Sequence, residues 1–235
     1  MQSFFCPIPN RARRRRICSV PLLLLLAVMV LTGGYISRMG DANLAETMDT
    51  VEKKVAITFD DGPDPDYTEM LLAGLRERGV KATFFLLGKQ VDRYPEIVAE
   101  IYEDGHLIGT HSYEHVNLKN LTDAAAIEQV DRTNAAICAI TGECPQFIRP
   151  PYGSWKNNLD YETEMIEVLW DIDPLDWKTS NSDVIARRVV DKVGENDIIL
   201  LHDASESSVN AAFKIIDALE KEGYTFVTVE EILFD

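Results

Sequence analysis

Short apolar runs alternate with amphipathic segments from residue 55 to the end of the chain. The amphipathic segments have apolar positions at three- and four-residue spacing, which predicts helices, and the short apolar runs predict buried strands. The predicted strands are residues 55–59, 83–87, 107–110, 146–149, 166–170, 198–201 and 225–229. The predicted helices are residues 67–78, 95–103, 122–140, 182–193 and 208–222. Glycines stand close after each of them, where helix C-caps are expected, at Gly79, Gly105, Gly142, Gly194 and Gly223.

The alternation of strands and helices predicts the fold class α/β with a parallel sheet. Seven strands of this kind close most simply into a barrel, so we expect a single domain with a deformed (β/α) barrel of about seven parallel strands. Residues 154–164 have no clear pattern and form either a short helix or a loop. The sequence contains no internal repeat and no linker to a second domain.

The first forty residues differ sharply from the rest. They hold six of the 23 basic residues, five of them within residues 11–16, and none of the 39 acidic residues. The uncharged stretch that follows just reaches the ~20 residues that cross a bilayer as a helix. We therefore predict a basic cytoplasmic segment (1–16), a transmembrane signal-anchor or cleaved signal peptide (17–37), a tether (38–53) and an exported domain (54–235). We favour the membrane anchor, because no clear small-x-small cleavage site follows the apolar run.

The composition is that of an ordinary globular protein. Of the 235 residues, 46% are hydrophobic and 26% are charged, which excludes a disordered or low-complexity chain. Beyond residue 40, 17 basic residues stand against 39 acidic ones, a formal charge of −22. A surface of this sign repels a phosphate backbone, so we expect no nucleic-acid partner. The sequence gives no indication of the oligomeric state.

Two cysteines, Cys138 and Cys144, fall in the domain that we expect to be exported, where a disulfide can persist. They flank Thr141 and Gly142, a turn signal after a predicted helix. The spacing fits a small disulfide-closed loop or two independent core residues, and it does not decide between them. No cysteine spacing typical of a zinc site occurs in the chain.

Polar residues that are typical of catalytic sites follow five of the seven predicted strands. In a parallel barrel the carboxyl ends of the strands meet at one rim, and active sites are built there. Chance placement would scatter such residues over both rims, so we expect one site. The residues at the strand ends are Asp60, Asp61, His111, His115, Arg149, Asp173, Asp176, Trp177, His202 and Asp203. We assign Asp173 only a supporting structural role.

Each of these pieces has an ordinary alternative when it is taken alone. The segment 60–63 could be a simple turn, since Asp and Gly favour turns. His111 and His115 are four residues apart, so a helical backbone would place both on one face, where they could bind a transition metal or simply lie at the surface. His202 could be a histidine at the edge of the core, and His106 fits an ordinary position at the entry of a strand. Only their convergence on one rim favours a site.

Five ordered motifs carry a resemblance to a known family. The chain resembles the polysaccharide deacetylases of carbohydrate esterase family four, which share the NodB homology domain, over residues 54–235. The motifs are Thr58-Phe59-Asp60-Asp61-Gly62-Pro63, His111-Ser112-Tyr113-Glu114-His115, Arg149-Pro150-Pro151-Tyr152-Gly153, Asp173-Pro174-Leu175-Asp176-Trp177 and Leu200-Leu201-His202. None of them lacks a key residue, so the resemblance implies an active enzyme.

The resemblance implies a metal-dependent deacetylation. Asp61, His111 and His115 would hold one divalent metal ion, zinc by default, although cobalt, nickel or manganese would suit the same ligands. Asp60 would be the general base that takes a proton from water. Arg149 would orient this base through a charge-assisted hydrogen bond.

The remaining motif residues would bind the substrate or supply a proton. The backbone N–H of Tyr152 would stabilise the oxyanion, and Trp177 and Leu200 would form an apolar seat for the acetyl methyl group. His202 would protonate the leaving amine. Asp176 would favour the cationic form of His202, because an opposite charge raises a histidine pKa.

Export and a membrane anchor place the expected activity outside the cytoplasm, beside the cell wall. We therefore expect N-acetylglucosamine of peptidoglycan as the substrate, with N-acetylmuramic acid, chitin-type glycans and acetyl-xylan as alternatives. A non-catalytic cell-wall glycan-binding protein is the alternative from another class. A metal-dependent phosphoester hydrolase is disfavoured, because Arg149 is the only basic phosphate clamp expected at the rim.

Overall fold

The computed structural model describes residues 53–156 and 163–234. These residues belong to one compact unit that spans Glu52–Asp235. The predicted segments 1–16 and 17–37, and most of the predicted tether, lie outside the described residues. Lys53, which we assigned to the tether, is the first residue of strand β1. Within the described ranges, no helix is both long and apolar enough to span a membrane.

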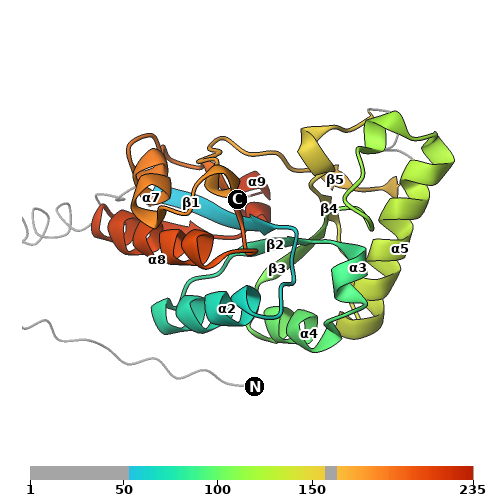
Figure 1. The fold of residues 1–235 in the computed structure, drawn as a ribbon, viewed down its shortest axis with the longest axis horizontal. Helices are drawn as coiled ribbons and strands as arrows, with labels where there is room; N and C mark the ends of the chain where they lie inside the picture. Colours follow the sequence, from blue (N-terminus) through green and yellow to red (C-terminus); the bar gives the residue numbers. More distant parts are fainter. Residues whose placement is uncertain (1–52, 157–162, 235) are drawn as a thin grey trace, which may run out of the picture. The chain divides into compact units, whose positions relative to one another are not determined.

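A curled, fully parallel sheet forms the centre of the domain (Figure 1). Its strand order is β5-β4-β3-β2-β1-β6, and β7 pairs with the first half of β1. Ile172, beyond β5, bridges to Ile199 of β6 and so brings the two ends of the sheet together. The predicted deformed barrel with about seven parallel strands is thus confirmed. The strands are β1 (Lys53–Asp60), β2 (Thr83–Leu86), β3 (Leu107–Thr110), β4 (Phe147–Ile148), β5 (Ile166–Glu167), β6 (Ile198–His202) and β7 (Tyr224–Val227).

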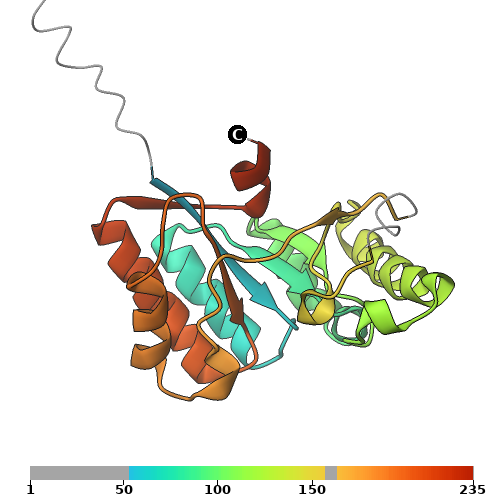
Figure 2. The same cartoon turned by 90° about the horizontal axis from the view of Figure 1, so that it is seen from above.

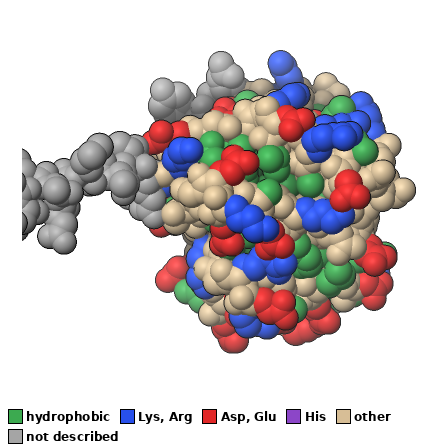
Figure 3. Space-filling view, turned by 90° about the vertical axis from the view of Figure 1, so that its left-hand side faces the viewer, with side chains coloured by type: hydrophobic (Ala, Val, Ile, Leu, Met, Phe, Trp, Pro, Cys, Tyr) green, Lys and Arg blue, Asp and Glu red, His purple; other side chains and the backbone are tan. Residues whose placement is uncertain are grey.

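Helices cover the outside of the sheet, as Figures 1 and 2 show. Along this layer α7 contacts α8, α8 contacts α2, α2 contacts α4, and α4 contacts α5. Figure 3 shows Lys and Arg interspersed with Asp and Glu on the side that carries α7 and α8. The helices are α2 (Tyr67–Arg78), α3 (Gly88–Val91), α4 (Pro95–Glu103), α5 (Asp123–Thr141), α7 (Ser182–Val190), α8 (Glu206–Lys221) and α9 (Val229–Phe234), with short 3-10 helices η1 (Leu118–Asn120), η2 (Pro151–Gly153) and η3 (Asp176–Lys178).

Alternate side chains of β1 point to opposite faces of the strand, one toward the main core and the other toward the inside of the barrel. Val55, Ile57 and Phe59 belong to the main core cluster, which includes residues of α2 and α8. The alternate residues lie on the opposite face of the strand, because successive side chains point to opposite sides. This alternation places Thr58 and Asp60 on the inner side of the barrel, where both contact one arginine.

Side-chain caps explain where several helices begin. Thr122, Asn181 and Ser205 each accept a hydrogen bond from a backbone N–H in the first turn of α5, α7 and α8. The prediction that α7 continues to residue 193 and is capped by Gly194 is wrong. The helix ends at Val190. Beyond it, the N–H groups of Lys192 and Val193 both donate to the Val189 carbonyl, so the regular i to i−4 pattern is interrupted at Lys192.

The chain after β7 also differs from the prediction. We expected a strand to residue 229, but Val229 begins α9. The N–H of Thr228 donates to the Glu231 carboxylate at 2.8 Å, and the Glu231 N–H donates back to the Thr228 hydroxyl at 3.4 Å. This reciprocal pair is a capping box, which starts a helix and ends the strand.

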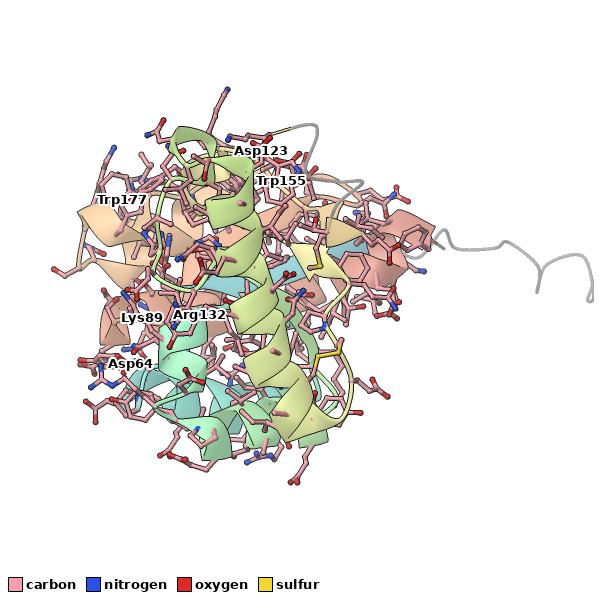
Figure 4. All side chains as sticks on the ribbon, turned by 90° about the vertical axis from the view of Figure 1, so that its right-hand side faces the viewer. Asp64, Lys89, Asp123, Arg132, Trp155 and Trp177 are labelled. Atoms are coloured by element: carbon pink, nitrogen blue, oxygen red, sulfur yellow. A yellow bond between two sulfur atoms is a disulfide. The ribbon has the colours of Figure 1, made fainter. Side chains whose placement is uncertain are left out.

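The two cysteines that the sequence left undecided form a disulfide. Cys138 lies in the last turn of α5 and Cys144 lies beyond Gly142, whose left-handed backbone ends the helix. Figure 4 shows this bond beside the C-terminal end of α5. The covalent link closes the short loop that leads into β4.

Candidate active site

A cavity of about 850 Å³ opens at the carboxyl ends of the strands. Of the ten residues to which the family resemblance assigns a role, nine line this cavity, and the tenth, Arg149, is fully buried and bonded to one of them. Of the two other strand-end residues, Asp173 also lines the cavity, whereas Asp203 is buried, is not among the lining residues and accepts a hydrogen bond from Thr68. The expectation of one shared rim is therefore met, while the roles of the residues stay predictions. The nine are Asp60, Asp61, His111, His115, Tyr152, Asp176, Trp177, Leu200 and His202.

Asp61, His111 and His115 offer three ligand atoms within 4.8 Å of one another. The Oδ1 atom of Asp61 lies 3.5 Å from His111 Nε2 and 3.3 Å from His115 Nε2. This oxygen is buried and has no hydrogen-bond partner, which is costly for a carboxylate unless a cation is close. Two imidazoles and one carboxylate are the donor set of an open transition-metal site, so these residues fit a divalent ion.

The orientation of His111 is fixed by the backbone. Its Nδ1 lies 2.6 Å from the Arg149 carbonyl oxygen, so the Nδ1–H donates there and Nε2 is directed toward Asp61. Burial lowers the pKa of His111, outweighing the nearby carboxylates that raise it. A lowered pKa favours the neutral imidazole, which is the form that binds a metal.

The loop between the two histidines is not helical, in contrast to the arrangement considered from their spacing. Ser112 and His115 have positive φ values of 64° and 58°, and this left-handed backbone brings the two rings to 5.2 Å between centroids. The side chain of Gln129 on α5 supports the loop. Its Oε1 accepts the backbone N–H of Tyr113 at 3.2 Å and that of Glu114 at 2.9 Å. Gln129 could not be identified from the sequence, because nothing distinguishes it from other polar residues of an amphipathic helix.

We expect Gln129→Leu to weaken metal binding, because two N–H groups between His111 and His115 lose their acceptor. Loss of such supporting hydrogen bonds typically costs about 10- to 100-fold in metal affinity. Competition with a chromophoric chelator measures the affinity directly. Gln129→Glu, which keeps an acceptor oxygen, should retain most of it, and Glu128→Leu on the exposed side of α5 is the matched control. Equal affinities for Gln129→Leu and the Glu128 control would contradict the assignment.

Gln129 belongs to a wider contact between α5 and this loop. Arg132, one turn further along α5, stacks 3.7 Å from the centroid of the Tyr113 ring. Figure 4 shows Arg132 beside Lys89 of α3. The backbone N–H of Lys89 donates to the Tyr113 carbonyl at 3.1 Å. The histidine loop is thus held by two helices that lie outside the sequence motifs.

Arg149 is buried beneath the cavity with every part of its guanidinium engaged. Nη1 donates to Asp60 Oδ1 at 2.8 Å and to Thr58 Oγ1 at 2.6 Å. Nε and Nη2 donate to the carbonyls of Val168 and Leu169. Burial lowers the pKa of Arg149, and the charge of Asp60 opposes this effect. The carbonyl groups of Val168 and Leu169 point toward Arg149 and are not available for pairing in the sheet. For this reason β5 ends at residue 167 and not at the predicted residue 170.

His202 and Asp176 form a second buried pair. The Nδ1 of His202 lies 2.8 Å from Asp176 Oδ1, and Ser208 donates to the other carboxylate oxygen at 2.7 Å. Burial alone would lower the pKa of His202, but the hydrogen bond and charge of Asp176, with smaller contributions from Asp60 and Asp61, raise it to about 9. The histidine is therefore cationic at neutral pH and can donate a proton.

Two aromatic side chains stand at the mouth of the cavity. Tyr152 is 66% exposed and Trp177 is 62% exposed, whereas Leu200 is buried in the wall. Tyr152 has a positive φ of 61°, and its ring packs edge-on against His115. These positions let the aromatic rings contact a ligand while Leu200 supplies an apolar surface behind them.

A half-barrel with a metal-binding cluster, a buried carboxylate and a cationic histidine at one rim defines the site of a metal-dependent hydrolase. The polysaccharide deacetylase family model matches residues 47–168. The chain belongs to the polysaccharide deacetylase family.

Relatives and solved structures agree with this membership. The chain is 40% identical to the peptidoglycan-N-acetylmuramic acid deacetylase PdaC of Bacillus subtilis (strain 168), over 80% of this chain and 40% of PdaC. It is 37% identical to a peptidoglycan-N-acetylglucosamine deacetylase of Bacillus cereus, over 77% of this chain and 89% of that protein. The solved structure of PdaC superposes with a TM-score of 0.76 at 39% identity, covering 79% of this chain and 92% of that chain. The chain thus corresponds to less than half the length of the full PdaC protein.

Proposed function

We propose that this domain hydrolyses N-acetyl groups of peptidoglycan, with N-acetylglucosamine as the first expected sugar and N-acetylmuramic acid as the second. The observation that carries the proposal is the meeting of three groups in one cavity: the Asp61-His111-His115 cluster, the Asp60–Arg149 pair and the His202–Asp176 pair. Binding alone needs no general base and general acid together. Relatives named for deacetylation of both sugars support the substrate class.

A divalent ion held by Asp61, His111 and His115, zinc by default and cobalt, nickel or manganese otherwise, supplies Lewis acidity toward the amide carbonyl. Asp60 accepts the proton of the attacking water. Arg149 fixes Asp60 in place, so that the free carboxylate oxygen faces the cavity.

The other half of the site handles the oxyanion and the leaving group. The backbone N–H of Tyr152 donates to the developing oxyanion, and His202 protonates the departing amine as the C–N bond breaks. Trp177 and Leu200 contact the acetyl methyl group. The products are acetate and a free amino sugar, which balances the addition of one water molecule.

We further propose that the domain acts outside the cytoplasm and is held at the membrane by residues 17–37. The basic segment 1–16 supports this orientation.

Acetate release from purified peptidoglycan tests the function. The full-length chain is incubated with zinc or cobalt, and a chelated sample is the control. We expect release only with metal, and mass spectrometry of the digested glycan then names the sugar. If a chain with measured metal binding releases no acetate from peptidoglycan, chitin oligomers or acetyl-xylan, the non-catalytic glycan-binding alternative replaces the proposal.

A further inference from the structure

The cavity continues beyond the proposed catalytic groups, between η3 and the start of α8. Side chains with hydroxyl groups line this part, from Thr179 and Ser180 on one side and from Ser205 and Ser207 on the other. Lys178 lies among them and is the only lysine or arginine among the described residues that line the cavity. The proposed mechanism assigns this cation no task.

Lys178 is an exposed residue whose backbone and side chain each make one contact near the cavity. Its backbone N–H donates to the Leu175 carbonyl at 3.1 Å within η3. Its Nζ lies 4.3 Å from the centroid of the Trp177 ring, a cation–π contact at the mouth of the cavity. In the described part of the chain, none of the ion pairs within 4.0 Å involves Lys178. Its charge therefore stays available to a ligand.

Most of the charged side chains around Lys178 in this cavity are acidic. The same cavity is lined by Asp60, Asp61, Asp173 and Asp176, and the chain beyond residue 40 has a formal charge of −22. The other positive charges of the cavity are already engaged, because His202 pairs with Asp176 and the proposed metal ion would be held by Asp61, so Lys178 is the cation there that a substrate carboxylate can pair with. An anionic group that pairs with this ammonium group is fixed in position relative to the reacting amide.

We propose that Lys178 selects glycan substrates that carry a carboxylate beside the acetamido group that is hydrolysed. The proposal rests on the proposed function and names its preferred substrate class. The carboxylate pairs with Nζ over the indole of Trp177, while the hydroxyl-lined part of the cavity holds neighbouring sugar hydroxyls. Lys178 touches substrate but not the reacting atoms, so it determines specificity and leaves the chemical step unchanged.

Two oligomers of equal length separate this role from a general electrostatic one. One is a neutral oligomer of N-acetylglucosamine, and the other alternates N-acetylglucosamine with N-acetylmuramic acid that has a free lactyl carboxylate. We measure kcat and KM by acetate release with the zinc-loaded full-length chain, and binding of both oligomers by calorimetry. The variants are Lys178→Gln and Lys178→Glu. Lys192→Glu, on an exposed residue outside the cavity lining, is the matched control for net charge.

We expect Lys178→Gln to lower kcat/KM for the carboxylate-bearing oligomer about fivefold, the size of one partly exposed ion pair, through KM. Lys178→Glu should lower it further, the neutral oligomer should stay within about twofold, and high salt should shrink the difference. An equal loss on both oligomers, or the same loss with Lys192→Glu, would overturn the proposal. If the wild type binds the oligomers but releases no acetate, the proposed function fails, and the calorimetric preference still decides the role of Lys178.

Discussion

Asp60→Asn is expected to lower kcat by about 10²- to 10⁴-fold, the usual contribution of a general base. The carboxamide has the same shape and can still accept the hydrogen bond that Arg149 Nη1 donates at 2.8 Å, but it cannot take a proton from water. Acetate release under saturating substrate measures kcat. Metal affinity should stay close to that of the wild type, because the metal-binding cluster uses the neighbouring Asp61.

The control for this substitution is Asp217→Asn. Asp217 pairs with Arg78 at 2.7 Å, so the change also breaks an Asp–Arg ion pair, but on the outer surface. We expect unchanged turnover for it. Asp61→Asn should instead lose metal affinity together with turnover, because Asp61 belongs to the metal-binding cluster. Turnover of Asp60→Asn within tenfold of the wild type would show that another group acts as the base.

Much of the site could be predicted because its residues follow strands. Asp60 follows an apolar run in β1 and His202 ends β6, and these two strands pair in register, with Asp60 opposite His202. Once the strands are known to be parallel, their carboxyl ends must meet at one rim. The sequence therefore indicates which side chains converge, even though Asp60 and His202 are 142 positions apart in the chain.

The supporting residues could not be predicted, because their local sequence is ordinary. Thr58 is a β-branched residue in a buried strand, and Ser208 lies in the first turn of a helix, where serine is common. Gln129 is a half-buried residue of an amphipathic helix. Their importance arises only when packing brings Arg149, Asp176 or the histidine loop next to them. Such contacts between elements leave no periodic signal in the chain.

The backbone conformation of the site could also not be predicted from the sequence. The left-handed residues Asp61, Ser112 and His115 are not glycines, so composition gave no sign of positive φ. Within the loop the His115 N–H donates to the Ser112 hydroxyl at 3.1 Å, and Gln129 of α5 accepts two further N–H groups of the same loop, a contact that the local sequence does not reveal. The spacing of Cys138 and Cys144 likewise permitted a bond without requiring one, since spacing does not fix the distance between two side chains.

The second large effect is expected for Asp176→Asn, which should move the alkaline limit of activity downward. In the native protein Asp176 opposes the effect of burial and raises the pKa of His202 to about 9. Without the carboxylate charge, burial dominates and the pKa of His202 should fall to about 6.5, its ordinary value, or lower. His202 is then protonated at pH 8 in the wild type but largely neutral in the variant. A general acid that has lost its proton cannot release the amine, so turnover at pH 8 should fall at least tenfold.

Asp176→Asn should also change how the stability of the fold depends on pH, because Asp176 raises the pKa of His202 in the folded state. A histidine whose pKa is higher in the folded than in the unfolded state stabilises the fold fully below about pH 6.5 and loses this contribution as the pH rises through about 9.

Proton NMR of the metal-free chain can follow the titration of His202 directly, because the protein has only four histidines and His202→Gln assigns the signal. A His202 pKa that stays near 9 in Asp176→Asn, with Asp217→Asn as the reference, would show that other charges hold the proton. In that case Asp60 and Asp61, which also raise this pKa, would be the groups that keep His202 cationic.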